Sequence, residues 1–223
     1  RDMPLPQSLT KVDEPLENPY NYEFLNFDAV ISTSADQTAI SIGELVNKYS
    51  KENRNYFHYQ AKAVPFRFAV SSAKYAIQKS NYNDIAIEVL YEPKHHQNIP
   101  HILKSIEKSL EYCETNFGKY PYKTLWFAEI SNFTRGFAAT AYPATIFINE
   151  RQFHLNLSQS EGQGVINELA GHELSHQWWG NNAQMSPAYR EGRGILIETL
   201  AQYTQLMLFK NEYGQTKMLE MVQ

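Results

Sequence analysis

The sequence predicts an α+β fold, because segments with strand periodicity come first and segments with helical periodicity follow them. Three early stretches are rich in β-branched and aromatic residues, with partial or clean alternation of apolar and polar side chains. Later segments instead carry apolar residues three and four positions apart, which is typical of helices that bury one face. These two observations indicate a β-rich first part and a mixed second part.

The first part is predicted to contain an extended arm and a β-rich unit. Residues 1–20 are polar and rich in proline, so we expect a linker or an arm that follows the surface. Tyr22–Ser32 and Tyr56–Val70 are predicted strands. Ser71–Asn83 has the polar composition of a connector. Residues 21–82 are therefore interpreted as the end of a β-sandwich-like N-terminal domain, with a boundary near residue 83.

The second part alternates between strand and helix patterns. Ile85–Tyr91 alternates cleanly and is a predicted strand, and Ile99–Phe117 has a helical pattern that contains Cys113. The other predicted elements are the strands Leu125–Ile130 and Thr145–Asn149, followed by the helices Val165–Trp179, Ile195–Leu208 and Gln215–Val222. Because the last helical pattern is still running near Gln223, we expect the second part to be incomplete at its C-terminal end.

Composition excludes several classes of function. The chain has 223 residues, a net charge of −4 and no run of Lys or Arg, so we expect no nucleic-acid partner. Cys113 is the one cysteine, which excludes an intramolecular disulfide and predicts a small, buried apolar side chain. No stretch resembles a signal peptide or a membrane span. The first residue is Arg1, so we expect this chain to be a fragment of a longer protein.

Residues 172–176 read His-Glu-Leu-Ser-His and predict a metal site. Residues four apart lie on one face of a helix, so His172 and His176 can present two imidazoles to one ion. Glu173 lies next to the first imidazole, where its carboxylate can take a proton from a metal-bound water. Two imidazoles and a carboxylate with a fourth position for water favour one zinc ion per chain, although cobalt or manganese could use the same ligands.

Two glutamates compete for the role of third ligand. Glu191 lies in Tyr-Arg-Glu-Gly-Arg-Gly, whose two glycines suggest a loop or the start of a helix. Glu198 lies in Ile195–Leu208, whose mostly apolar composition predicts a largely buried helix. An acid in a buried helix is costly unless it is paired or bound to metal, which favours Glu198.

The run His-Glu-Leu-Ser-His-Gln-Trp-Trp-Gly-Asn at 172–181 resembles the active-site helix of the aminopeptidase N family of gluzincin metallopeptidases. Glu198-Thr-Leu-Ala-Gln-Tyr resembles the segment that carries the family's third zinc ligand. The resemblance implies a thermolysin-like catalytic domain over residues 83–223, zinc bound by His172, His176 and Glu198, and Glu173 as general base. The connector between His176 and Glu198 is three residues longer than the family's usual one, an extension that costs little in loop closure.

A second departure concerns the substrate. Family members carry a Gly-x-Met-Glu-Asn strand whose glutamate holds the free amino terminus of the peptide, and Ala141 falls at that glutamate's position here. A methyl group cannot pair with an ammonium, so we expect a peptidase that is not a standard aminopeptidase. The backbone of Ala139, Thr140 and Ala141 would still bind an extended peptide by strand addition.

The resemblance is greatest to one branch of the family. In bacteria, peptidase-like domains of this branch are fused to membrane permeases of the ABC-transporter type. The branch implies a permease portion in the same full-length protein, and a membrane-associated, extracytoplasmic location through parts outside this chain. An alternative function is a zinc-containing peptide-binding domain with weak or no catalysis, attached to such a transporter. Hydrolysis of a non-peptide amide or an epoxide fits the same residues.

Overall fold

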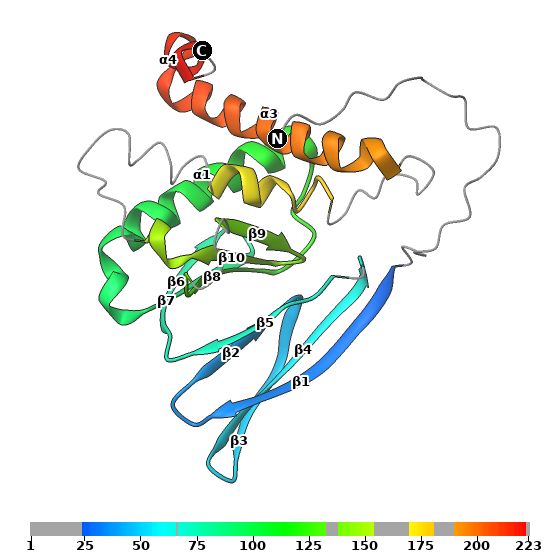
Figure 1. Cartoon of the computed structure of the whole chain (residues 1–223), viewed down its shortest axis with the longest axis vertical. Coiled ribbons are helices and arrows are strands. Elements are labelled where there is room, and N and C mark those ends of the chain that lie inside the picture. Colours follow the sequence, from blue (N-terminus) through cyan, green and yellow to red (C-terminus); the bar gives the residue numbers. More distant parts are fainter. Residues whose placement is uncertain (1–23, 66, 133–137, 154–169, 181–189, 222–223) are drawn as a thin grey trace, which may run out of the picture.

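The computed structural model describes residues 24–65, 67–132, 138–153, 170–180 and 190–221 of the chain (Figure 1). Its α+β class agrees with the prediction, because β-strands dominate the first part and the helices come later. The strands are β1 (Leu25–Ser34), β2 (Thr38–Ser41), β3 (Glu44–Lys51), β4 (Arg54–Val64), β5 (Val70–Ala73), β6 (Ala76–Tyr82), β7 (Ile85–Tyr91), β8 (Thr124–Ile130), β9 (Ala139–Tyr142) and β10 (Thr145–Asn149). The helices are η1 (Pro93–Asn98), α1 (Ile99–Phe117), η2 (Glu150–Gln152), α3 (Arg190–Tyr213), α4 (Gln215–Met221) and the helical segment 170–175. The arm predicted for residues 1–20 lies outside the described residues.

The N-terminal part packs a three-stranded antiparallel sheet, ordered β1-β4-β3, against the small antiparallel pair β2-β5 (Figure 1). Phe57 and Tyr59 of β4 are buried against Ala39 of β2. The Tyr59 hydroxyl donates to the Ala39 carbonyl at 3.0 Å, which satisfies this buried phenol.

The prediction of a connector over Ser71–Asn83 is wrong. Most of that stretch belongs to β5 and to β6, and β6 pairs antiparallel with β7 from Ala76 to Tyr82. β6 lies at an edge of its sheet and most of its side chains are at least partly exposed, so its sequence is polar and resembles that of a connector. The sheet of the second part therefore begins at Ala76, before the boundary predicted near residue 83.

Two further strands, β2 and β3, were not predicted from the sequence. β3 forms an edge of its sheet and exposes most of its residues, so it lacks an apolar pattern. Its hairpin with β4 turns at Glu52 and Asn53, which have φ values of 50° and 57°. Two consecutive residues with positive φ are the requirement of the tight hairpin turn that suits twisted strands. The predicted strand Tyr56–Val70 also ends early, because β4 stops at Val64 and Val70 belongs to β5.

The second part is built on a five-stranded mixed sheet ordered β6-β7-β8-β10-β9. β7, β8 and β10 run parallel to one another, and β6 and β9 are antiparallel edges. α1 covers one face of this sheet, where Cys113 is fully buried as predicted (Figure 1). Burial raises the pKa of the Cys113 thiol to about 12, which is unfavourable for reactivity. The opposite face packs on the N-terminal part through Trp126, Phe147 and Ile40.

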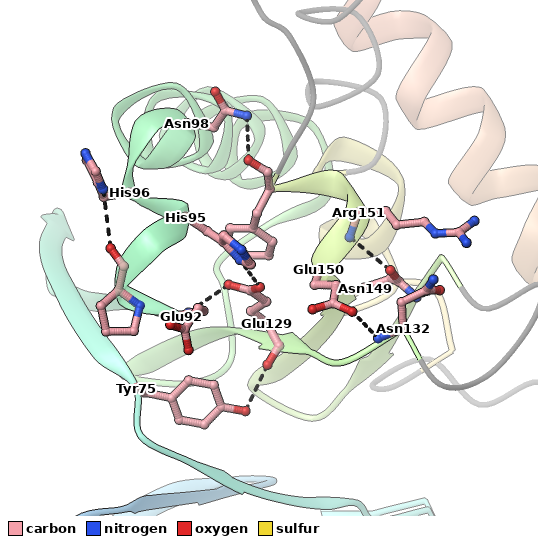
Figure 2. Close-up of polar contacts among 12 residues, drawn as sticks. Tyr75, Glu92, His95, His96, Asn98, Glu129, Asn132, Asn149, Glu150 and Arg151 are labelled. Atoms are coloured by element: carbon pink, nitrogen blue, oxygen red, sulfur yellow. Dashed lines mark hydrogen bonds and ion pairs between the residues drawn. The ribbon is translucent and has the colours of Figure 1, made fainter.

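A group of buried polar contacts fixes the end of β8 to the turn that precedes α1 (Figure 2). The Glu129 carboxylate is 5% exposed, accepts a hydrogen bond from the Glu92 amide at 2.8 Å and pairs with the His95 imidazole. The Tyr75 hydroxyl donates to the Glu129 carbonyl at 2.8 Å, and the Asn98 side chain donates to the Phe153 carbonyl at 2.8 Å. These contacts satisfy the buried carboxylate, which is what a structural role in anchoring the sheet requires.

β9 and β10 form a hairpin that leaves β9 as a sheet edge. The Asn149 amide donates to the Ala138 carbonyl at 2.9 Å, and Phe147 lies opposite Thr140. Bonded and non-bonded pairs alternate along an antiparallel ladder, so Thr140 bonds to β10 while the backbone groups of Ala139 and Ala141 point away from it. The polar groups available at this edge therefore belong to Ala139 and Ala141.

Candidate metal centre

The helical segment 170–175 and the turn after it bring the two predicted imidazoles together. The Nε2 atoms of His172 and His176 are 3.2 Å apart, and both side chains are largely buried. The predicted helix Val165–Trp179 ends earlier than expected, because residues 176–178 form a turn, and residues 165–169 lie outside the described part. The amides of Gln177 and Trp178 bond to the carbonyls three positions before them, which tightens this last turn.

Glu198 of α3 faces the two histidines. Its Oε2 lies 3.3 Å from His172 Nε2, and its Oε1 lies 3.6 Å from His176 Nε2. The sequence argument for this residue was nevertheless wrong, because the Glu198 side chain is 61% exposed. α3 buries Ala201 and Thr204 and leaves Tyr203 exposed, so the described side chains of this helix pack on one face only. The alternative ligand, Glu191, lies in the first turn of α3, and its side chain lies outside the described part.

Glycines allow α3 to approach the histidine segment closely. A Cβ atom on Gly171 would lie 2.7 Å from the Leu208 side chain, and one on Gly180 would lie 3.1 Å from Ile197. Gly180 also has a φ of 110°, which a residue with a side chain adopts only with strain. Ile197 directly precedes Glu198, so the space left at Gly180 helps to place the Glu198 carboxylate, the third candidate ligand.

The orientation of His176 leaves a lone pair on the atom that faces Glu198. His176 Nδ1 lies 3.0 Å from the Trp179 carbonyl oxygen. A carbonyl only accepts, so Nδ1 carries the proton and the Nε2 of the neutral ring is an acceptor. A backbone carbonyl in this position is the usual outer partner of a metal-binding histidine. His172 Nδ1 is buried and has no hydrogen-bond partner among the described residues.

The three side chains fit one small, borderline-soft cation. Ligand atoms from His172, His176 and Glu198 all lie within 4.8 Å of one another. Tetrahedral zinc, with bonds of about 2.0–2.1 Å to nitrogen and oxygen, sets its ligand atoms about 3.4 Å apart. The contacts of 3.2, 3.3 and 3.6 Å lie close to that spacing. Facing acceptor atoms are satisfied by a cation or by a proton between them, and the spacing of these atoms fits a zinc-sized cation.

Glu173 directly follows His172, one of the candidate metal ligands, and is bonded to the edge strand β9. Its side chain is buried, and its carboxylate accepts a hydrogen bond from the Ala141 amide of β9. The pKa of this carboxyl is raised to about 7, mainly by burial and also by the charge of Glu198, whereas the Ala141 bond and Arg67 act in the opposite sense. A carboxyl with a pKa near neutrality suits a group that must both accept and return a proton.

Gln177 fixes the edge strand to the metal centre, and sequence reasoning did not single it out. Its buried side-chain amide donates to the Tyr142 carbonyl at 2.9 Å and accepts from the Ala144 amide at 3.0 Å. These two bonds hold the turn of the β9–β10 hairpin, where Ala144 has a φ of 59°. The sequence feature that could have identified Gln177 was its position directly after His176.

Zinc affinity is expected to resist mild acid. Burial lowers the pKa of both His172 and His176 below the ordinary value of 6.5, and for His172 the neighbouring His176 lowers it further. Protons therefore compete with zinc only at more acidic pH than they do for a free imidazole. We expect a constant zinc dissociation constant from about pH 8 to about pH 6.5 and weaker binding below that range. Competition with a chromophoric chelator measures it, and a loss of affinity already between about pH 8 and about pH 7 would contradict the expectation.

Comparison with known families and with curated proteins found no match to this chain. In the described part of the chain, no helix is both long enough and apolar enough to cross a membrane. The functional proposal for this protein therefore depends on the residues and the geometry of the metal centre.

Proposed function

We propose that this protein is a zinc-dependent peptidase of the gluzincin type, with His172, His176 and Glu198 as zinc ligands and Glu173 as general base. The observation that carries the proposal is the convergence of the three ligand side chains beside a buried carboxyl that is bonded to a free strand edge. A purely structural metal site needs no such carboxyl, so the position of Glu173 favours catalysis over metal-stabilised folding.

Residues of this chain would each have a separate role in hydrolysis. Zinc, when bound, supplies Lewis acidity that activates water and polarises a carbonyl. Glu173 accepts the proton of the attacking water and then delivers it to the nitrogen of the leaving amine. The Ala141 amide keeps the Glu173 carboxylate aimed toward the ligands, and the Trp179 carbonyl keeps His176 in the tautomer that can bind metal.

The edge of β9 provides the place for an extended peptide. The backbone groups of Ala139 and Ala141 point away from β10. The Ala141 amide bonds to Glu173, so the Ala139 amide and carbonyl and the Ala141 carbonyl would be the groups that bind a peptide. A peptide added to this edge would direct alternate side chains to the two faces of the sheet. On the face opposite the metal centre, a cavity of about 350 Å³ is lined by Thr140 and Tyr142 together with residues of the N-terminal part. That cavity is large enough to receive a substrate side chain.

The wider assignment follows the same resemblance. The second part would be a thermolysin-like domain, and the protein would be membrane-associated through a permease portion of the full-length molecule. Ala141 offers no charge to an amino terminus, so the peptidase would not be a standard aminopeptidase. Binding of peptides without cleavage would instead identify a transporter-linked binding domain.

A zinc titration with matched variants tests the ligand set. Native mass spectrometry of chain purified without a nickel column should show one zinc per chain. Glu198→Ala should weaken zinc binding more than about tenfold, because it removes the candidate ligand whose carboxylate contacts both imidazoles. Glu191→Ala, a change of an equally acidic residue in the same helix, should leave the affinity unchanged. Wild-type protein loaded with zinc should cleave peptides, and should lose and regain cleavage on chelation and zinc return.

The titration has two outcomes against the proposal. Loss of zinc in Glu191→Ala but not in Glu198→Ala would reassign the third ligand. Absence of zinc binding by folded wild-type protein supplied with zinc would refute the metal centre.

A further inference from the structure

Arg67 lies over the end of the strand that holds the general base. It belongs to the segment between β4 and β5, and its guanidinium carbon lies 4.9 Å from the centre of the Tyr142 ring. Tyr142 ends β9, and its carbonyl is bonded by Gln177 of the metal-centre segment. The preceding residue, Ala141, bonds to Glu173. A residue from the N-terminal part thus contacts the strand end that orients Glu173.

The Arg67 guanidinium has N–H donors available to bind a ligand. Arg67 is exposed, and its side chain forms no ion pair or hydrogen bond with the residues that the structure describes. Attraction between a cation and the face of an aromatic ring needs no oxygen acceptor, so it does not use the N–H groups of the guanidinium in hydrogen bonds. Those N–H groups form the planar fork that matches the two oxygens of a carboxylate. Tyr142 therefore positions Arg67 without using the part that binds anions.

Arg67 lies close to the candidate metal centre. The carbonyl of Tyr142, whose ring lies under the guanidinium, is bonded by Gln177, which directly follows His176. Ala141, the residue before Tyr142, bonds to Glu173. A carboxylate bound at Arg67 would consequently lie beside the reacting groups, whereas an ammonium there would be repelled.

We propose that Arg67 binds a carboxylate of the peptide substrate at the end of β9, so that the site prefers peptides with an acidic group close to the scissile bond. The inference rests on the proposed peptidase function and names its substrate class. The carboxylate has two possible sources, a C-terminal carboxylate or an Asp or Glu side chain. Both present the same pair of oxygens to the guanidinium, and peptides that carry one or the other distinguish them.

The test measures peptide binding without turnover. Zinc-loaded Glu173→Gln protein is titrated calorimetrically with the N-acetylated hexapeptide Ala-Ala-Phe-Ala-Ala-Ala as its C-terminal amide, as its free acid, and as amides with Glu at each alanine in turn. At least one acidic peptide should bind about tenfold more tightly than the neutral amide. Adding Arg67→Gln should abolish that preference, and Arg67→Lys should retain only part of it, because an ammonium lacks the planar fork.

Controls separate a local effect from a general one. Lys62→Gln removes another exposed cation of the N-terminal part and should leave the preference intact. Equal zinc content and circular dichroism of the Arg67 variants exclude misfolding as a cause. Equal affinity for acidic and neutral peptides, or a preference that survives Arg67→Gln, overturns the inference while leaving the peptidase intact. If zinc-loaded wild type neither binds nor cleaves any of these peptides, the proposed function fails and the inference fails with it.

Discussion

Replacing Glu173 by glutamine is expected to reduce peptide hydrolysis by about 10³-fold while leaving one zinc bound per chain. Glutamine has nearly the same shape, and its carbonyl oxygen can still accept the hydrogen bond from Ala141. It cannot accept the proton of an attacking water at neutral pH, so the loss should appear in the chemical step. Measuring kcat and KM on one peptide should show a fall in kcat with little change in KM.

Two measurements decide how the Glu173 result is interpreted. Glu88→Gln, a half-buried glutamate of β7 that pairs with an exposed lysine, is the matched control and should stay within about twofold of wild type. Zinc content by mass spectrometry should be equal in all three proteins. Undiminished hydrolysis by Glu173→Gln would exclude the residue as general base, and simultaneous loss of zinc would show that its role is to support the metal centre.

The elements that bury an apolar face were predictable from the sequence. The predicted bounds are those of β7, α1 and β10, which are Ile85–Tyr91, Ile99–Phe117 and Thr145–Asn149. The spacing of apolar residues along the sequence depends directly on which side chains are buried. Edge strands have little to bury, so β3 and β6 carried no such signal. Their recognition depends on pairing with distant strands, which a local pattern does not contain.

The approach of the two histidines, which are the candidate metal ligands, was predictable for a different reason. The spacing of His172 and His176 is a property of one helical turn, so local structure is sufficient to bring them together. Glu198 was chosen on the argument that its helix is buried, yet its side chain is largely exposed. Its position instead depends on the approach of α3 permitted by Gly171 and Gly180. That approach is tertiary information. The sequence offered only the acidic residue and the resemblance of Glu198-Thr-Leu-Ala-Gln-Tyr to a ligand-bearing segment.

The contacts around Glu173 join three parts of the chain that are distant in sequence. Gln177 binds the turn of the β9–β10 hairpin, and Arg67 lies over the Tyr142 ring at the end of β9. Because Glu173, the proposed general base, takes its hydrogen bond from Ala141 in the same strand, a shift of β9 would move Glu173 and the proposed peptide-binding edge together. Under the proposed function, one short strand would set the geometry of both catalysis and substrate binding.

Replacing His176 by alanine is expected to weaken zinc binding by more than about 100-fold, because loss of a ligand should exceed the 10- to 100-fold cost of losing an outer partner. The change removes the Nε2 atom that lies 3.2 Å from His172 and 3.6 Å from Glu198, and it removes the bond that Nδ1 makes to Trp179. Chelator competition measures the affinity directly.

Thermal unfolding with and without zinc supplies an independent readout of the same change. Zinc that binds the folded state alone raises the unfolding temperature of wild type, so the rise should disappear in His176→Ala. His101→Ala, which removes an exposed histidine of α1, should retain both the affinity and the rise. If His176→Ala still binds one zinc with wild-type affinity, the ion is held by other residues and the helical histidine pair is not the metal centre. If instead the metal-free variant unfolds as wild type does but no longer responds to zinc, the ligand function of His176 is separated from its packing.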